Sequence, residues 1–146
     1  MNRLLLILVA AACLTGCATD NFVSYEGPAR PASEVAVIYG AATNDHKILK
    51  GLDDGIAIIA VDKKLTSVVW GGNFATKVTV LPGRHYFSLR WAHAGVSAQG
   101  KIWIDCEAGK TYVIQRKIVG YKVRLWAEEE GTGKVVGGIP GGEPES

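Results

Sequence analysis

The sequence predicts an all-β domain, built as a single antiparallel β-sandwich of about seven to nine short strands. Apolar residues recur at every second position from Glu34 onward, which is the period of a strand with one buried face. Turn signals rich in glycine and proline follow one another about every 8–12 residues. No stretch of about eleven residues or more has the spacing of an amphipathic helix.

A signal for export precedes the predicted domain. Residues 1–3 give a short basic start, and residues 4–14 form an uncharged apolar run. A helix that spans a bilayer needs about 20 apolar residues, so this run is too short to remain as a transmembrane helix. Small residues and then Cys17 follow the run. This layout predicts a secretory signal peptide over residues 1–16.

The segment Leu14-Thr15-Gly16-Cys17 resembles the lipobox of bacterial lipoproteins. The resemblance implies that the chain is cut before Cys17, whose sulfur then carries diacylglycerol and whose new amino group is acylated. The membrane would thus be a partner reached through lipid, and several acyl chains make release negligible. An ordinary signal peptide, or an uncleaved anchor that happens to contain Cys17, is the alternative. Ala18 is not the aspartate of an inner-membrane retention signal, which favours the periplasmic face of the outer membrane over the inner membrane.

Residues 17–33 are expected to form a lipidated N-terminus and a flexible tether. Gly27, Pro28 and Pro31 exclude a helix in this segment. At no more than about 3.3 Å per residue, the tether would reach a few tens of ångströms from the bilayer. The predicted sandwich then spans residues 34–137, and the glycine- and proline-rich residues 138–146 form a disordered tail.

Individual strands are marked by apolar runs that turn residues separate. Asp62-Lys63-Lys64 predicts a hairpin turn, and Pro82-Gly83 is the strongest turn signal of the chain. The run 56–61 is continuously apolar, as in a strand covered on both faces. The expected strands cover residues 35–39, 56–61, 65–70, 77–81, 85–91, 96–106, 111–119, 122–128 and 134–136.

Two turns resemble those of small bacterial envelope domains of the PEGA or transthyretin-like kind. They are Leu81-Pro82-Gly83-Arg84-His85 and Glu107-Ala108-Gly109-Lys110-Thr111-Tyr112. From Tyr25-Glu26-Gly27-Pro28 to Thr132-Gly133-Lys134-Val135-Val136-Gly137, the chain also resembles a family of uncharacterised proteobacterial lipoproteins. These resemblances imply a sandwich, with an immunoglobulin-like form as the other possibility. They imply no activity, because the shared motifs are turns, which specify a fold and not a chemistry.

Charge and cysteine content narrow the functional classes. The formal net charge is +2 at pH 7, and a chain so close to neutral has no field that recruits nucleic acid, so no nucleic-acid partner is expected. Once Cys13 leaves with the signal peptide and lipid caps Cys17, Cys106 has no intramolecular partner. Because Cys106 shares a face with Ile102 and Ile104, we expect it to fill the core rather than to act in catalysis or metal binding.

Catalytic and metal-binding signatures fail on spacing. Gly109-Lys110-Thr111 ends like a phosphate loop, but Ile104 stands where the first glycine is required. The histidines have no metal-ligand spacing, and the aspartates near strand ends are explained by turn capping. We therefore expect no enzyme, no metal and no cofactor. The residues considered are His46, His85, His93, Asp53, Asp54 and Asp62.

Trp103 and Trp126 are the functional candidates that remain. Each points away from its apolar neighbours along the chain, and Arg124 shares the face of Trp126. Two tryptophans on solvent-leaning faces predict a contact patch for an envelope protein or a glycan. Cover by a second sheet or a long loop is the alternative. We expect a membrane-anchored envelope lipoprotein with a non-catalytic structural or protein-interaction role, or else a small-ligand or glycan-binding module.

Overall fold

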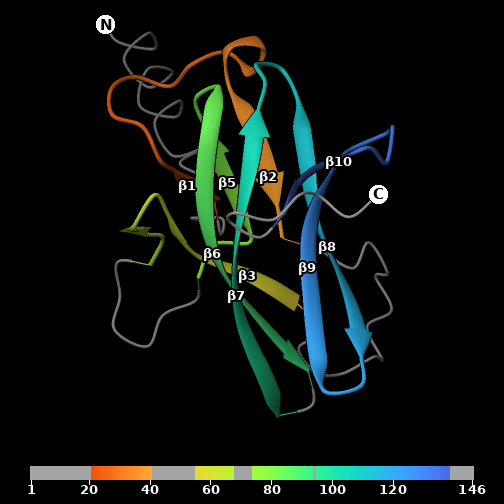
Figure 1. Ribbon diagram of the computed structural model, residues 1–146. Coiled ribbons are helices and arrows are strands. Elements are labelled where there is room, and N and C mark those ends of the chain that lie inside the picture. The colour runs from red at the N-terminus through yellow and green to blue at the C-terminus, as the bar shows by residue number, and fades with distance from the viewer. Residues whose placement is uncertain (1–20, 41–54, 68–73, 94, 139–146) are drawn as a thin grey trace, which may run out of the picture.

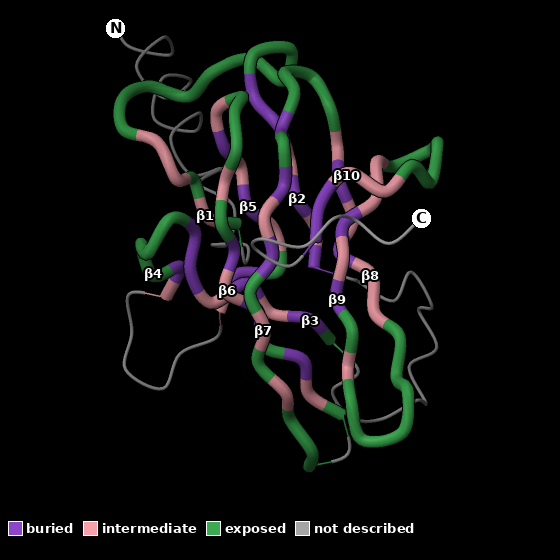
Figure 2. Tube along the Cα trace, viewed as in Figure 1, coloured by how far each residue is buried: buried purple, intermediate pink, exposed green. Residues whose placement is uncertain are grey.

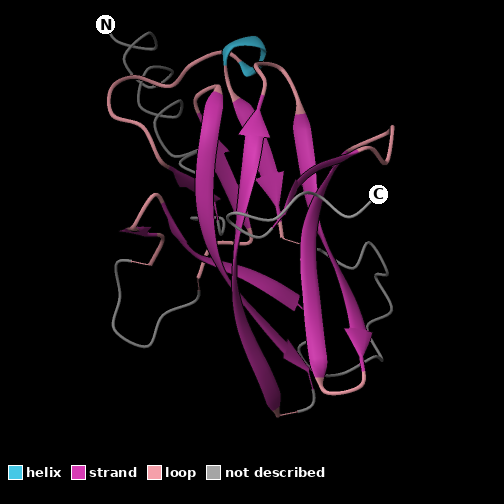
Figure 3. Cartoon of the chain, viewed as in Figure 1, coloured by secondary structure: helices cyan, strands magenta, loops and turns pink. Residues whose placement is uncertain are grey.

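The computed structural model describes residues 21–40, 55–67, 74–93 and 95–138. These residues form ten strands and one turn of 3-10 helix, η1 (Ala32–Glu34), so the fold is all-β, as the sequence predicts (Figures 1 and 3). Within them, no helix has the length and apolar character that crossing a membrane requires. The strands are β1 (Asn21–Val23), β2 (Ala36–Tyr39), β3 (Gly55–Val61), β4 (Lys64–Leu65), β5 (Lys77–Val80), β6 (Gly83–His93), β7 (Val96–Cys106), β8 (Thr111–Val119), β9 (Lys122–Glu129) and β10 (Val135–Gly138).

All ten of these strands belong to one sheet, in the order β1-β5-β2-β8-β9-β10-β7-β6-β3-β4. Two neighbouring pairs are parallel: β1 with β5, and β2 with β8. The sheet is therefore mixed, and the prediction of a purely antiparallel arrangement is wrong. The physical reason is that alternation determines the face a side chain occupies, but not the strand that lies beside it.

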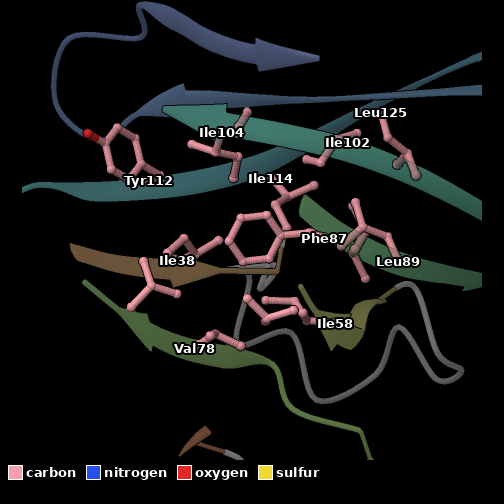
Figure 4. Close-up of a cluster of buried hydrophobic side chains, with 14 of the residues drawn as sticks. Ile38, Ile58, Val78, Phe87, Leu89, Ile102, Ile104, Tyr112, Ile114 and Leu125 are labelled. Atoms are coloured by element: carbon pink, nitrogen blue, oxygen red, sulfur yellow. The ribbon is translucent and has the colours of Figure 1, made fainter. Parts of the chain in front are cut away.

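The sheet curls, and its inner face encloses the hydrophobic core. Figure 4 shows side chains from opposite ends of the strand order, Val78 of β5 and Ile58 of β3, converging on the same core as Ile38, Ile104 and Ile114. Each fully buried side chain of this size stabilises the fold by roughly 1.5–3 kcal/mol relative to an exposed one. The largest fully buried side chains are Tyr112, Phe87, Ile38, Ile56, Ile58, Leu89, Ile102, Ile104, Ile114, Val61, Val78 and Val80.

Strand β7 illustrates how the alternation in the sequence becomes packing. Ile102, Ile104 and Cys106 are buried, whereas Trp103 between them is half-buried and Asp105 is exposed. The expected position of Cys106 in the core is thereby confirmed, with 4% of the residue exposed. Opposite residues on neighbouring strands share a face, so the same alternation continues across β6 and β9.

Strand β3 and the turn after it lie where the sequence predicts, but the expected cover on both faces is incomplete, because Ala57 and Ile59 are only half-buried. The pairing of β3 with β6 shifts between Ile58 and Ala60, so Ile59 is the extra residue of a β-bulge. Asp62 and Lys63 form the tight turn, with φ of 48° and 70°. Positive φ at both central residues fits the twist of an antiparallel hairpin. Of the strand expected at 65–70, only Leu65 lies in a strand, which also takes in Lys64 from the predicted turn, and residues 68–70 lie outside the described part.

Strand β1 corrects the predicted tether. The three residues of β1 pair in parallel with residues 77–79 of β5, and Phe22 packs against the core. The amide of Ser24 also donates to the carbonyl oxygen of Thr79 over 3.0 Å. A strand of three residues has too few positions for alternation to be recognised, and its partner lies far along the chain. The segment 17–33 is thus not a continuous free tether, because the sheet begins at Asn21.

Candidate functional site

Three rings form a row on the outer face of the sheet, and we refer to Tyr86, Trp103 and Trp126 as the outer aromatic row. Trp103 pairs with Tyr86 of β6 on one side and with Gly138 of β10 on the other. Trp126 flanks β10 from β9 and is adjacent to Ala127, which pairs with Gly137. Tyr86 is 50% exposed, and both tryptophans are half-buried. The structure therefore brings together the two tryptophans that the sequence singled out.

Strand β10 lies between the two tryptophans, and its residues at this level, Gly137 and Gly138, have no side chains that would separate the rings. A Cβ on Gly137 would lie 2.0 Å from the carbonyl oxygen of Trp103, so only glycine allows this approach. Gly137 and Gly138 are buried between β9 and β7 (Figure 2). The predicted disordered tail at 138–146 is therefore wrong at its first residue, because glycine content alone does not distinguish a loose tail from a closely packed strand. Residues 139–146 lie outside the described part.

Arg84 orders the Trp103 end of the row. Its guanidinium carbon lies 4.3 Å from the centre of the Trp103 ring, within the range of a cation–π contact. Its Nε and Nη2 donate to the two carboxylate oxygens of Asp105 over 2.6 and 2.7 Å. The hydrogen bonds from Arg84 hold the pKa of Asp105 below its usual value. The guanidinium is thus held over an aromatic ring by a bidentate partner.

Trp126 has a polar partner of its own. Its indole Nε1 donates to Oε1 of Glu128 over 2.7 Å, which fixes the ring orientation on β9. Arg124 is exposed on the same strand, two residues before Trp126, and pairs with Lys117 of β8. The predicted sharing of one face by Arg124 and Trp126 is consistent with this register.

A shallow hollow of about 450 Å³ adjoins the row on the side of β3 and β4. Ser88 pairs with Lys101 two positions beyond the Tyr86–Trp103 pair, so both face outward with the rings. The hollow also has Leu65 and Lys63 at its margin. Its lining combines two ammonium groups with apolar surface, and no carboxylate contributes to it. Alternation along the chain does not predict this hollow, because strand pairing places β7, β6, β3 and β4 next to one another in that order.

His85 is satisfied within the fold, as its position in line with the core predicts. Its Nδ1 lies 2.6 Å from Oδ2 of Asp62, and its Nε2 lies 2.8 Å from the carbonyl oxygen of Leu81. The other oxygen of Asp62 accepts the amide of Tyr86 over 2.9 Å. Both ring nitrogens and both carboxylate oxygens are thus used to close the turn. Asp62 occupies a turn, as expected, whereas Asp53, Asp54 and His46 lie outside the described residues.

Cys106 and His93 add no reactive centre. Burial raises the pKa of the Cys106 thiol to about 12, and the nearby carboxylates of Asp105 and Asp62 act in the same direction. A thiol with so high a pKa is not a nucleophile at neutral pH. His93 stacks on Trp91 with ring centres 6.1 Å apart. In the part of the chain that the structure describes, no three His, Cys, Asp or Glu residues come together as a metal site.

The outer aromatic row and the hollow present side chains that are suited to making contacts. Flat rings at an exposed face stack on sugar rings or on apolar side chains, and Arg84, Lys63 and Lys101 suit carboxylates or phosphates. Within the described residues, the groups at this face are engaged with one another and do not converge on a single reacting atom.

Comparison with known proteins gives no relative for this chain. No protein-family model matches the sequence. No curated protein and no solved structure shows significant similarity to it. The segment Leu14-Thr15-Gly16-Cys17 lies outside the described residues.

Proposed function

We propose that this chain is a lipoprotein of the bacterial cell envelope, held by lipid on Cys17 at the periplasmic face of the outer membrane. The observation that carries the proposal is the order of features in residues 1–17: a basic start, a short apolar run, small residues and a cysteine. The curled sheet is the exported module, and its two facing parts serve as the layers of a sandwich. Membership of a family of uncharacterised proteobacterial lipoproteins belongs to the same proposal.

The role we propose is non-catalytic binding of another envelope protein through the outer aromatic row. Aromatic and arginine side chains are enriched where protein interfaces gain most of their binding energy. Tyr86, Trp103 and the stacked Arg84 give the row this composition. Half-buried rings held by Asp105 and Glu128 lose little conformational freedom when a partner covers them.

A glycan ligand is the second candidate, and the hollow beside the row favours it. Rings that stack on sugar faces lie next to Lys63 and Lys101, which suit an acidic saccharide. Trp103→Ala is then expected to abolish retention on an acidic envelope polysaccharide, and Tyr39→Ala, an aromatic change on the distant strand β2, to leave it intact. The protein-binding role is favoured instead by two results together. The unaltered protein is not retained on the polysaccharide, and Trp103→Ala loses a protein partner that cross-links to the unaltered protein.

The lipid anchor has a direct test. Replacement of Cys17 by serine removes the sulfur that carries the lipid, and we expect the protein to leave the membrane fraction and to lose the mass of its acyl groups. Ala18→Ser, a change at the next residue, is the control and keeps both. If the Cys17→Ser protein stays in the membrane fraction with unchanged mass, the proposed anchor is refuted.

A further inference from the structure

Two long hairpins end on the same side of the molecule. Ile104 of β7 and Ala127 of β9 are at the same level, because both pair with Gly137. From that level, β7 and β9 extend in the same direction to Val96 and Lys122, and the tips of the β6–β7 and β8–β9 hairpins project together at the lower end of Figure 1. We call this the hairpin-tip end.

The hairpin-tip end exposes apolar side chains that the core does not cover. Among the described residues, seven large hydrophobic residues are exposed, and four of them lie here. Val96, Ile118 and Val119 are 63%, 54% and 51% exposed, and Tyr121 is fully exposed. Figure 2 shows the ends of both hairpins in the colour of exposed residues. Apolar groups gathered at a projecting tip indicate a contact surface rather than scattered surface residues.

Charge is segregated along the same strands. The stretches 86–93, 95–104 and 111–127 contain no Asp or Glu. The acidic residues of these hairpins lie at or beyond the opposite strand ends, as Asp105 and Glu128 do. The near-neutral net charge of the chain does not reveal this separation of basic from acidic residues. The basic residues of the acid-free stretches are Arg90, Lys101, Arg116, Lys117, Lys122 and Arg124.

Strand β1 directs the N-terminal side of the domain toward this end. Asn21 pairs with Lys77, Lys77 with Tyr39, and Tyr39 with Val113. This chain of pairs makes β1 antiparallel to β8, which runs toward its hairpin tip. The N-terminal end of β1 therefore faces the hairpin-tip end. Asn21 follows Cys17 by four residues, which span at most about 14 Å.

We propose that the hairpin-tip end is a lipid-contact surface that lies in the headgroup layer of a membrane with anionic phospholipids. The inference rests on the proposed lipid anchor at Cys17 for its orientation. Tyr121 belongs to the residue types that settle at the membrane interface, and Ile118 and Val119 reach the boundary of the acyl chains. Lys117 and Lys122 flank these apolar residues and pair with lipid phosphates.

Probes on opposite ends of the domain test the contact. Tyr121→Cys and Ala108→Cys, labelled with an environment-sensitive dye, are placed in the full-length protein on vesicles that contain phosphatidylglycerol. Ala108 is exposed in the turn between β7 and β8, away from the hairpin tips. We expect a blue shift and quenching by a lipid-borne quencher at position 121 and neither effect at 108. Equal signals at both positions overturn the proposal.

A charge reversal gives the matched control. Lys117→Glu is expected to weaken binding of unlipidated protein to phosphatidylglycerol vesicles about thirtyfold, because each basic residue near the surface contributes roughly a factor of five. Lys134→Glu makes the same charge change in the exposed turn before β10 and is expected to leave binding unchanged. Equal binding to vesicles of phosphatidylcholine alone refutes the role of the basic residues.

The outcomes separate this inference from the anchor. A lipidated protein without a shift at position 121 keeps the anchor and overturns the tip contact. If the protein isolated from cells carries no lipid mass on Cys17 and still shows the shift, the tip contact is kept and the anchor is overturned. A shift only in the lipidated protein supports both, and a protein with neither lipid nor shift refutes both.

Discussion

At the scale of single residues, the fold places chemically capable groups where their chemistry is suppressed. Cys106 is the only cysteine among the described residues, and it fills the core beside Ile104. Its Sγ lies 3.8 Å from the carbonyl oxygen of Ile104. Burial disfavours the thiolate, which is the form that attacks and that binds metals. Cys106 therefore acts as a small apolar side chain.

We expect Cys106 to resist alkylation in the folded protein at neutral pH, since its pKa is raised to about 12. In a background with Cys13 and Cys17 replaced by serine, iodoacetamide should label the thiol only after a denaturant is added. Ala108→Cys provides an exposed thiol two residues away and should react at once. Rapid labelling of Cys106 under native conditions would contradict its assignment to the core.

Gly137 is, with Gly40, one of the two described glycines at which an added methyl group would overlap a backbone oxygen at 2.0 Å. Its Cβ would overlap the carbonyl oxygen of Trp103 at 2.0 Å, and backbone on both strands cannot yield without breaking the ladder. We expect Gly137→Ala to lower the free energy of unfolding by about 2 kcal/mol or more, measured by urea denaturation. Gly55→Ala meets no atom within 4 Å and should be neutral or slightly stabilising.

At the scale of elements, the sequence predicts where strands lie along the chain better than it predicts which strands pair in the sheet. Period-two alternation located Ile102, Ile104 and Cys106 on the inner face of β7, because burial selects every second residue. It could not reveal the parallel pairing of Val37 with Thr111, because nothing in either segment encodes its partner. Alternation also predicts that Trp103 and Trp126 point away from the core. It does not predict that they align across Gly138, because that alignment depends on which strands pair.

The pairing of β8 with β9 carries an ion pair that makes stability depend on pH. Lys110, just before β8, donates to the carboxylate of Glu129 at the end of β9. The hydrogen bond lowers the pKa of Glu129 and raises that of Lys110. A lowered acid pKa stabilises the fold above the ordinary value of 4.5 and ceases to do so as the pH falls through the lowered pKa. A raised lysine pKa stabilises it below 10.5 and ceases to do so as the pH rises through the raised pKa.

We therefore expect the pair to stabilise the fold fully between about pH 4.5 and 10.5, and to lose this effect as the pH falls through the lowered pKa of Glu129 or rises through the raised pKa of Lys110. Glu129→Gln should lower Tm slightly at pH 7, because exposed pairs are weak, and the difference from the unaltered protein should vanish in strong acid. Glu130→Gln changes the exposed neighbour and should shift Tm less. A Glu129→Gln effect that is constant from pH 2 to 7 would argue against the ion pair.

At the scale of the whole molecule, the proposed lipid anchor and the proposed tip contact make β1 and the hairpin-tip end act on the same quantity, the distance of the domain from the bilayer. With β1 in the sheet, the domain begins at Asn21, four residues after Cys17, a span of at most about 14 Å. Without β1, the next strand begins at Ala36, nineteen residues after Cys17, and the reach grows to roughly 60 Å. The three-residue strand β1 therefore determines whether the linker between the proposed lipid and the domain is short or long.

The pairing of β1 and the tip contact each hold the domain near the bilayer, so the effects of removing them on this distance should be non-additive. Phe22→Asp places a charge among the core residues that β1 contacts and should detach the strand, while Lys117→Glu should weaken the tip contact. In lipidated protein, either change alone leaves the other constraint in place, so energy transfer from a probe at Ala108→Cys to the bilayer should change little. The double variant should lose most of the transfer. The control is a double variant in which Val23→Asp, a change on the exposed side of β1, replaces Phe22→Asp. This control should keep the transfer. Equal transfer in the double variant and the unaltered protein would show that neither β1 nor the tips control the distance.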